Sequence, residues 1–442
     1  MLRRIFYLAL LLTLVTLPAA LRGQTNDTDG LIQRMQIKVK LYPGDYKAFA
    51  SLGAAYLQKG RETGDAADYE LAKSALSKSL SLLSNDPAAA FAMTQMAVAC
   101  MAEHRFTDAY NWAQRALAAG SGDPSPWAIA GDALADVGDY KKADEAYSKL
   151  TSTFGSADEQ QAIAYQRESR VAYLRFIAGD TPGAIQRTNA ALQIANELHM
   201  PAENRAWTNY QSGEEYFQLG DMKHAEKAYQ QALDLYPGYY RALAGLAKVR
   251  GAEGNLREAA DLYDKAITAV PYPEYAAALG DVYEAMGQAD KARKEYELVE
   301  FIGHLSEINE QIHNRDLALF YADHGLKLDR AEALARKELE VRQDVYTWDV
   351  LAWALYKNGK YDEAYQASEK ALQYGTRDAM LLYHGGVIAA KAGKYEEAQQ
   401  DLMAALAINP HFHLTYADAA RKSLSFLTAE NSSKASVDDH AR

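Results

Sequence analysis

The sequence predicts an all-α protein built from a tandem series of helix-turn-helix units. The first observation is composition: 442 residues include only 11 Pro and 28 Gly, beside 30 Tyr and many Ala. So few helix breakers favour helices along the whole chain. The second observation is a set of small and large residues that recurs about every 34 residues. A fixed period of this length indicates stacked repeats that bury a shared core.

The stretch LAWALYKNGKYDEAYQASEKAL, residues 351–372, shows one unit. It carries a small residue on the first helix, Gly359 in the turn, Tyr361 at the start of the second helix, and Ala364 one turn later. A shift of 34 residues finds the pattern again in GGVIAAKAGKYEEA. Earlier copies are AGDALADVGDYKKA, SGEEYFQLGDMKHA, LAKVRGAEGNLREA and LGDVYEAMGQADKA. Small residues at these positions allow the two helices of a unit to cross closely.

The Ala of the second helix places ten repeats along the chain. These anchors are Ala72, Ala109, Ala143, Ala184, Ala225, Ala259, Ala292, Ala331, Ala364 and Ala398. Repeats two, four and eight match least well, and repeat four has Arg175 where Tyr is usual. Departures from the 34-residue spacing indicate longer helices or loops.

These residues resemble the tetratricopeptide repeat (TPR) family. The resemblance implies a right-handed α-solenoid of about ten TPR helix-turn-helix units with a C-terminal capping helix. The stretches LAWALYKNG, GTRDA and NPHFH are also similar to those of exported bacterial TPR proteins, a group that brings no established activity. The expected divisions are a signal peptide (1–23), an N-terminal segment with a short helix (24–45), the solenoid (46–410), the capping helix (411–427) and a disordered tail (428–442).

The N-terminus predicts export. Arg3 and Arg4 precede an apolar run over residues 5–17, and Pro18 ends it. The run is shorter than the roughly 20 residues that span a bilayer, and its layout is typical of a secretory signal peptide. A periplasmic or secreted protein is therefore expected. The alternative is an uncleaved inner-membrane anchor at residues 5–17, which would keep the protein close to the membrane.

The sequence contains no familiar catalytic motif. Phosphate-binding, dinucleotide-binding, zinc-protease and nucleophile-elbow patterns are absent, and the single Cys100 falls at a core position of its repeat. His411 and His413 lie close together, but a capped turn explains them better than a metal site. The sequence predicts no catalytic residue, no cofactor, no metal and no enzyme. A net charge of −12 without a basic block also disfavours nucleic acid as a partner.

Candidate binding residues come from the family resemblance, which implies a concave groove lined by the first helix of each unit. Repeats four to six offer Tyr173, Phe176, Trp207, Tyr210, Phe217, Arg241 and Lys248, and repeats nine and ten offer Tyr346, Trp353, Tyr356 and Tyr383. Aromatic residues of this kind are enriched in interface hot spots. Alternatively, they pack on neighbouring helices of a tightly wound solenoid.

We therefore expect a non-catalytic protein–protein interaction scaffold or adaptor of the cell envelope, with a peptide or partner protein in the concave groove. Two alternatives remain open. One is a binder of a non-protein envelope ligand, such as a cell-wall glycan stacked on Trp207 or Trp353. The other is a regulatory subunit of an envelope enzyme. Fold-level similarity supports binding in general and names no partner.

Overall fold

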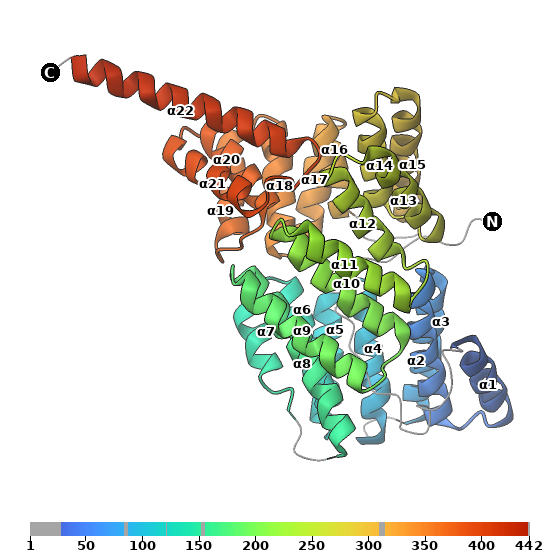
Figure 1. Cartoon of the computed structure of the whole chain (residues 1–442). Coiled ribbons are helices and arrows are strands. Elements are labelled where there is room, and N and C mark those ends of the chain that lie inside the picture. Colours follow the sequence, from blue (N-terminus) through green and yellow to red (C-terminus); the bar gives the residue numbers. More distant parts are fainter. Residues whose placement is uncertain (1–27, 84–86, 121, 152–154, 309–313, 441–442) are drawn as a thin grey trace.

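The computed structural model describes residues 28–83, 87–120, 122–151, 155–308 and 314–440 (Figure 1). All regular structure within these ranges is helical, and no strand occurs in them. The expected signal peptide, residues 1–23, lies outside the described residues. None of the helices in the described ranges combines the length and the apolar character that a membrane span requires.

The predicted series of ten helix pairs is confirmed. In the N-terminal half the pairs are α2 (Tyr46–Thr63) with α3 (Ala66–Leu82), α4 (Ala90–Ala102) with α5 (Phe106–Ala118), α6 (Ser125–Asp136) with α7 (Tyr140–Tyr147), α8 (Ala157–Ile177) with α9 (Thr181–Glu197), and α10 (Ala202–Gln218) with α11 (Met222–Leu235). In the C-terminal half they are α12 (Tyr240–Ala252) with α13 (Leu256–Ala269), α14 (Pro273–Ala285) with α15 (Ala289–Ile308), α16 (Asn314–His324) with α17 (Leu328–Leu339), α18 (Val345–Lys357) with α19 (Tyr361–Leu372), and α20 (Ala379–Lys391) with α21 (Tyr395–Ile408). Helix α1 (Thr28–Leu41) precedes the series and α22 (Tyr416–His440) follows it. All ten anchor alanines lie on the second helix of a pair and are 0% exposed.

Close packing explains why the pattern alternates small and large residues. A β-carbon added at Gly213 on α10 would lie 2.5 Å from the ring of Tyr229 on α11. Tyr147 and Tyr296 cover Gly131 and Gly280 in the same way. Each of these tyrosines therefore fills the space that a side chain on the first helix would need, and the pairing fixes the distance between the two helices.

The turns between paired helices also follow from local sequence. Gly138 ends α6 with φ of 79°, a left-handed conformation that glycine adopts without the steric cost of a β-carbon. Asp139 then caps α7, because its carboxylate accepts a hydrogen bond from the backbone N–H of Lys142 at 3.1 Å. The same Gly-Asp sequence joins α8 to α9 and α10 to α11.

The array of repeats closes on itself, so that α18 and the loops beside it rest on the edge of repeats three and four. Figure 1 shows the C-terminal repeats lying directly against the N-terminal half. The backbone N–H of Gln343 donates to the carbonyl of Asp136 at 3.0 Å, and the hydroxyl of Thr376 donates to the carbonyl of Ile177 at 2.6 Å. Val345 and Leu381 are buried in one apolar cluster with Tyr140 and Tyr147.

A buried group of charges reinforces this contact. Arg342 is 3% exposed. Its guanidinium lies 3.2 Å from the carboxylate of Asp136 and over the ring of Phe106, 4.8 Å from the centroid. A second ion pair joins Arg315 to Asp344 at 3.2 Å. Burial raises the pKa of Asp136 to about 7, against the lowering effect of Arg342. Removing one partner from such a group leaves the other charge buried and unpaired, which costs about 3–5 kcal/mol.

Helix α10 contacts both ends of the array. Glu203 at its start lies 3.8 Å from Arg61 of α2 in the first repeat. The side-chain amide of Asn409, which follows α21 of the last repeat, donates to the carbonyl of Phe217 at 2.7 Å. The fifth repeat therefore bridges the first and the tenth.

The C-terminal helix differs from the predicted one in its limits. It begins at Tyr416 rather than at 411, because residues 411–415 form turns, and it continues to His440 through the segment predicted to be a disordered tail. The prediction was based on polar composition. Polar residues do not end a helix, however, and the segment from Tyr416 to His440 contains neither Pro nor Gly to do so.

Two turn glycines test the closed arrangement. A β-carbon at Gly138 would lie 2.5 Å from the carbonyl oxygen of Gln343, and one at Gly179 would collide with the carbonyl of Gly375. Gly254 has the same φ of 79° as Gly138 but has nothing within 4 Å. Ala at Gly254 should therefore cost only the left-handed strain of about 1–2 kcal/mol.

We expect Gly138→Ala and Gly179→Ala to cost more than Gly254→Ala in denaturant unfolding and to increase the radius of gyration in small-angle X-ray scattering. The matched Gly254→Ala variant should keep the wild-type radius. Equal stabilities and equal radii for all three variants would show that these turns do not hold the array closed.

Candidate functional site

Several acidic side chains of the inner face are bound within their own repeat. Asp132, Glu214 and Asp281 each follow the small glycine of a first helix. Each accepts a hydrogen bond from the tyrosine that packs on that glycine, from Tyr147 at 2.9 Å, Tyr229 at 2.7 Å and Tyr296 at 2.9 Å. The tyrosine thus fills a space with its ring and satisfies a carboxylate with its hydroxyl.

The same three acids bind a basic residue from the first helix of the next repeat. Arg170 makes two contacts of 2.8 Å with Asp132, Lys248 lies 2.5 Å from Glu214, and His324 lies 2.8 Å from Asp281. Burial alone would lower the pKa of His324, but the hydrogen bond and the charge of Asp281 raise it overall. We call these three acid–base pairs the inter-repeat ladder.

The ladder accounts for the predicted groove residue Lys248, whose ammonium is engaged by Glu214 instead of facing an open groove. Arg241, the other predicted basic residue of repeat six, is partly buried and lies over the ring of Tyr240, 5.1 Å from its centroid. Phe217 is 7% exposed and belongs to the apolar core of repeats five to seven. Lys248 and Phe217 therefore hold neighbouring repeats together.

The aromatic residues of repeats nine and ten are covered by the end of the chain. Trp353 is 2% exposed, and its indole N–H donates to Asp323 at 2.8 Å. Tyr416 at the start of α22 donates to the same carboxylate oxygen at 2.6 Å and packs edge-on against the indole. Tyr383, 5% exposed, stacks on Tyr416 with ring centroids 5.0 Å apart. Tyr356 stacks on Trp353 and stays partly exposed. In the structure, Trp353, Tyr356 and Tyr383 therefore pack against neighbouring side chains, which is the alternative to lining an open groove.

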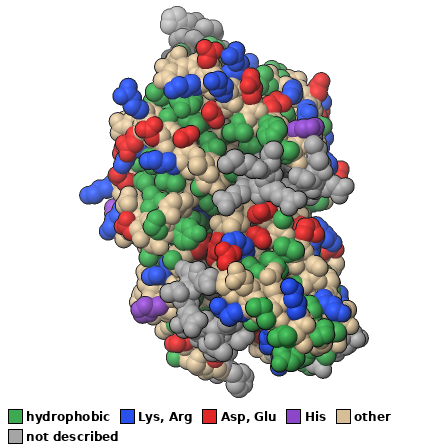
Figure 2. All heavy atoms as spheres, turned by 90° about the vertical axis from the view of Figure 1, so that its right-hand side faces the viewer, with side chains coloured by type: hydrophobic (Ala, Val, Ile, Leu, Met, Phe, Trp, Pro, Cys, Tyr) green, Lys and Arg blue, Asp and Glu red, His purple; other side chains and the backbone are tan. Residues whose placement is uncertain are grey.

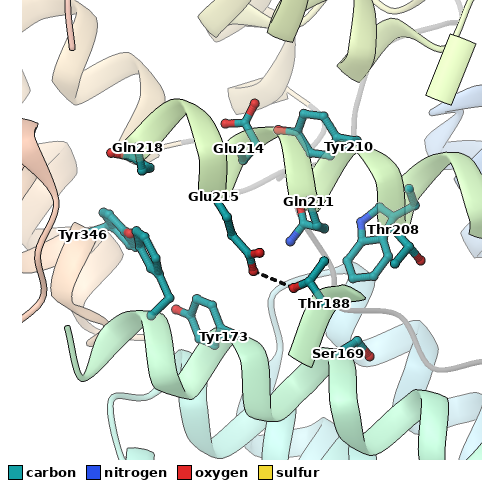
Figure 3. Close-up of a pocket in the computed structure, with 12 residues that line it drawn as sticks. Ser169, Tyr173, Thr188, Thr208, Tyr210, Gln211, Glu214, Glu215, Gln218 and Tyr346 are labelled. Carbon is teal, nitrogen blue, oxygen red and sulfur yellow. Dashed lines mark hydrogen bonds between the residues drawn. The ribbon is translucent and has the colours of Figure 1, made fainter. Parts of the chain in front are cut away.

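The remaining predicted aromatic residues line one pocket. Tyr173 and Phe176 project from α8, Trp207 and Tyr210 from α10, and Tyr346 from α18. Figure 3 shows Tyr173, Tyr210 and Tyr346 around the opening between these helices. The cavity has a volume of about 210 Å³. Its other lining residues are Ser169, Thr188, Thr208, Gln211, Glu214, Glu215 and Gln218.

The pocket combines aromatic residues from repeats that are distant in the sequence. Tyr173, Phe176, Trp207 and Tyr210 come from neighbouring repeats four and five, whereas Tyr346 belongs to repeat nine. The closed array brings Tyr346 there, because Val345 is buried against repeat three. No local pattern places residues so far apart in sequence at one site.

Glu215 is the charged residue of the pocket that the sequence did not single out. Its Oε1 accepts a hydrogen bond from the hydroxyl of Thr188 at 2.6 Å, drawn as the dashed line in Figure 3. Its Oε2 is buried and has no hydrogen-bond partner within the described ranges. Burial raises the pKa of Glu215 to about 7, and the Thr188 bond lowers it only in part.

Comparison with known proteins agrees with this architecture. A family model described as tetratricopeptide repeat matches residues 210–273 and 350–411. The chain contains tetratricopeptide repeats. Stacked repeats of this kind form extended concave surfaces that bind other proteins.

Among curated proteins, this TPR chain is 23% identical to a TPR repeat-containing protein of Methanocaldococcus jannaschii over 243 residues, 54% of this chain and 36% of that protein. It is 42% identical to the uncharacterized protein ycf37 of Pyropia yezoensis over 53 residues, 12% of this chain and 30% of that protein. The chain thus spans about a third of the length of these curated relatives.

Among solved structures, a tetratricopeptide repeat protein from Parabacteroides merdae is 18% identical with a TM-score of 0.34, over 60% of this chain and 99% of that one. Yeast Tom70 is 12% identical with a TM-score of 0.34, over 86% and 96% of the two chains.

The two tryptophans allow the covered and the open aromatic groups to be told apart. Trp353→Ala should lower the free energy of unfolding by about 3–5 kcal/mol, because it leaves a cavity under α22 and removes a partner of Asp323. Trp207→Ala, at a partly exposed wall of the pocket, should cost clearly less. Denaturant unfolding of both variants checks this order. A Trp353→Ala variant as stable as Trp207→Ala would mean that α22 does not seal repeats nine and ten.

Proposed function

We propose that this protein is a non-catalytic scaffold that binds an extended peptide, or an extended segment of a partner protein, at the pocket between α8, α10 and α18. The observation that carries the proposal is the convergence of five aromatic side chains from three repeats around one cavity. Clusters of aromatic residues in a concave site supply large contact areas for little loss of side-chain entropy.

The dimensions of the pocket support a peptide rather than a folded domain as the anchor. A cavity of about 210 Å³ is somewhat larger than an engineered 150 Å³ cavity that admits benzene. It can therefore take one side chain of a partner, while flanking residues of that partner follow the inner helices. A few buried anchors of this kind carry most of the binding energy in protein interfaces.

The engagement of the inner acids supports a non-catalytic role. Asp132, Glu214 and Asp281 are each held by a tyrosine and a base, an arrangement that stabilises the stack of repeats. Among the described residues Glu215 is hydrogen-bonded to Thr188, without the linked nucleophile and base that acyl-transfer chemistry needs. Within the described residues, no group of three or more His, Cys, Asp or Glu is placed to hold a metal ion.

A cell-wall glycan is the second candidate ligand. The pocket offers Trp207 for stacking against a sugar ring, together with the amides of Gln211 and Gln218 for its hydroxyl groups. A regulatory subunit of an envelope enzyme would use the same surface to contact that enzyme. The charge of the outer surface does not favour one of these ligands over another, since Figure 2 shows acidic and basic side chains interspersed over the face in view.

A location in the cell envelope is part of the proposal and rests on residues 1–23. A fusion of residues 1–30 to alkaline phosphatase, which is active only after export, should give active enzyme in a bacterial host. Arg3→Glu with Arg4→Glu should reduce that activity severalfold, because the positive n-region is required for insertion. Equal and low activity of both fusions would place the protein inside the cell and remove the envelope from the proposal.

Peptide selection tests the binding function itself. We expect a random-peptide display library, screened on the full chain, to yield sequences whose affinity falls at least about 30-fold in Trp207→Ala, the loss typical of an interface hot spot. Trp112→Ala is the matched control, because Trp112 lies on α5 outside the pocket and stacks with Arg115. If no selected peptide discriminates between the two variants, the pocket is not the peptide site.

A further inference from the structure

We propose that the pocket selects a positively charged side chain, lysine or arginine, as the anchor of the bound peptide. This inference rests on the proposed function and names the chemistry of its ligand. Three independent observations lead to it: the aromatic walls, the balance of charge in the lining, and a neighbouring cation that already occupies an equivalent arrangement.

The walls present aromatic rings on three sides. Trp207 and Tyr210 on α10 and Tyr173 and Phe176 on α8 line the cavity. Figure 3 shows Tyr210 and Tyr173 on opposite sides of the opening and Tyr346 of α18 beside it. The face of an aromatic ring carries partial negative charge, so it attracts a cation within about 6 Å and repels an anion. This attraction strengthens when the cation is removed from water, as it is in a cavity.

The charge of the lining has one sign. The twelve lining residues include two acids, Glu214 and Glu215, and no basic residue. Glu214 is already bound by Lys248 and Tyr229. Glu215 has a hydrogen bond on one oxygen only, and its buried Oε2 has no hydrogen-bond partner in the described structure. An N–H donor that carries positive charge would satisfy this oxygen, whereas a carboxylate or phosphate would meet a second negative charge.

The protein already contains the proposed arrangement one residue away. The ammonium of Lys248 lies 2.5 Å from the carboxylate of Glu214 and over the ring of Phe217, 5.3 Å from its centroid. A cation between a glutamate and an aromatic ring is therefore a stable arrangement on this helix. In the pocket, Glu215 corresponds to Glu214 and the aromatic walls correspond to Phe217. The cation that would correspond to Lys248 would come from the ligand.

The protonation of Glu215 makes the inference measurable. Its pKa of about 7 means that roughly one molecule in eleven carries the ionised form at pH 6 and roughly ten in eleven at pH 8. The surrounding titratable groups do not change in this range: burial raises the pKa of Tyr173, Tyr210 and Tyr346 well above 10. Lys248 from α12 faces Glu214, and on α9, the helix of Thr188, Arg187 is paired with Glu168. Affinity for a cation should therefore rise about tenfold from pH 6 to pH 8 and level off above it.

The experiment uses N-acetyl-argininamide as the cationic probe and N-acetyl-citrullinamide as its uncharged isostere. Both are titrated into the full chain at pH 6 and pH 8, with binding followed by ligand-observed NMR. We expect the arginine probe to bind at least about tenfold more tightly than the citrulline probe at pH 8, and to lose about tenfold at pH 6. In Glu215→Gln the pH dependence should disappear, and the preference for arginine at pH 8 should fall severalfold, to what the aromatic walls alone supply.

The variant should fold, because a carboxylate with a raised pKa destabilises the folded state when it ionises, and the amide removes that cost. Asp401→Asn is the matched control. Asp401 is another partly buried acid with a raised pKa, about 6, and it lies on α21 away from the pocket. This variant should keep the preference for arginine and its pH dependence. Equal binding of the two probes, or a preference unaltered by Glu215→Gln, would overturn the inference.

Peptide selection separates this inference from the proposed function. Selected peptides that depend on Trp207 and are enriched in Lys or Arg support both. Trp207-dependent peptides without such enrichment would support the peptide-binding function but overturn the proposal that the pocket selects a cation. Saturable binding of N-acetylglucosamine oligomers that is independent of pH would also overturn it, in favour of the glycan.

Discussion

The contact between repeats three and four and the loops beside α18 is the constraint on which the rest of the molecule depends. It brings the turn at Gly138 so close to the carbonyl of Gln343 that a β-carbon at this position would collide with the carbonyl oxygen. It buries Arg342 between carboxylates and an aromatic ring. It also carries Tyr346 to the edge of the pocket. Without this contact the inner face would be an open groove, and the aromatic residues of repeats four and nine would lie apart.

The inter-repeat ladder shows how a solenoid can use charges on its inner face for its own assembly. Each acid joins its own repeat to the next one, through a tyrosine on one side and a base on the other. A buried carboxylate is costly unless both its charge and its hydrogen bonds are satisfied, and here both conditions are met within two repeats. The acids of the ladder serve the fold and differ in this from Glu215, whose buried Oε2 has no hydrogen-bond partner among the described residues.

The sequence predicted the parts of the structure that depend on neighbouring residues. The anchor alanines and the glycine–tyrosine pairs follow from a helix crossing that every repeat shares, so a period of about 34 residues is enough to find them. The family resemblance implies that Trp207 and Trp353 both face a groove, and the structure gives them different surroundings. Direction does not determine exposure, however. Trp353 is covered by Tyr416 and Trp207 borders a cavity, and this difference arises from where α22 packs and where the array closes.

Other features had no signal in the sequence. Tyr346 reaches the pocket only through contacts with repeats far away in the chain, and Glu215 becomes important only because Thr188 and the surrounding helices exclude water from it. The extension of α22 to His440 was missed for a different reason. Polar composition was taken as evidence against order, although a helix ends at specific breakers, which this segment lacks.

The closed array has a consequence for how the chain folds. In an open solenoid each unit touches only its neighbours, so stability is a sum of local terms and the ends can unravel by themselves. Here hydrogen bonds join residues separated by 199, 205 and 236 positions. Such links raise the average sequence separation of contacts and must overcome the entropy of closing a long loop. The chain should therefore assemble more slowly than a linear array of equal length, and its terminal repeats should melt together with its middle.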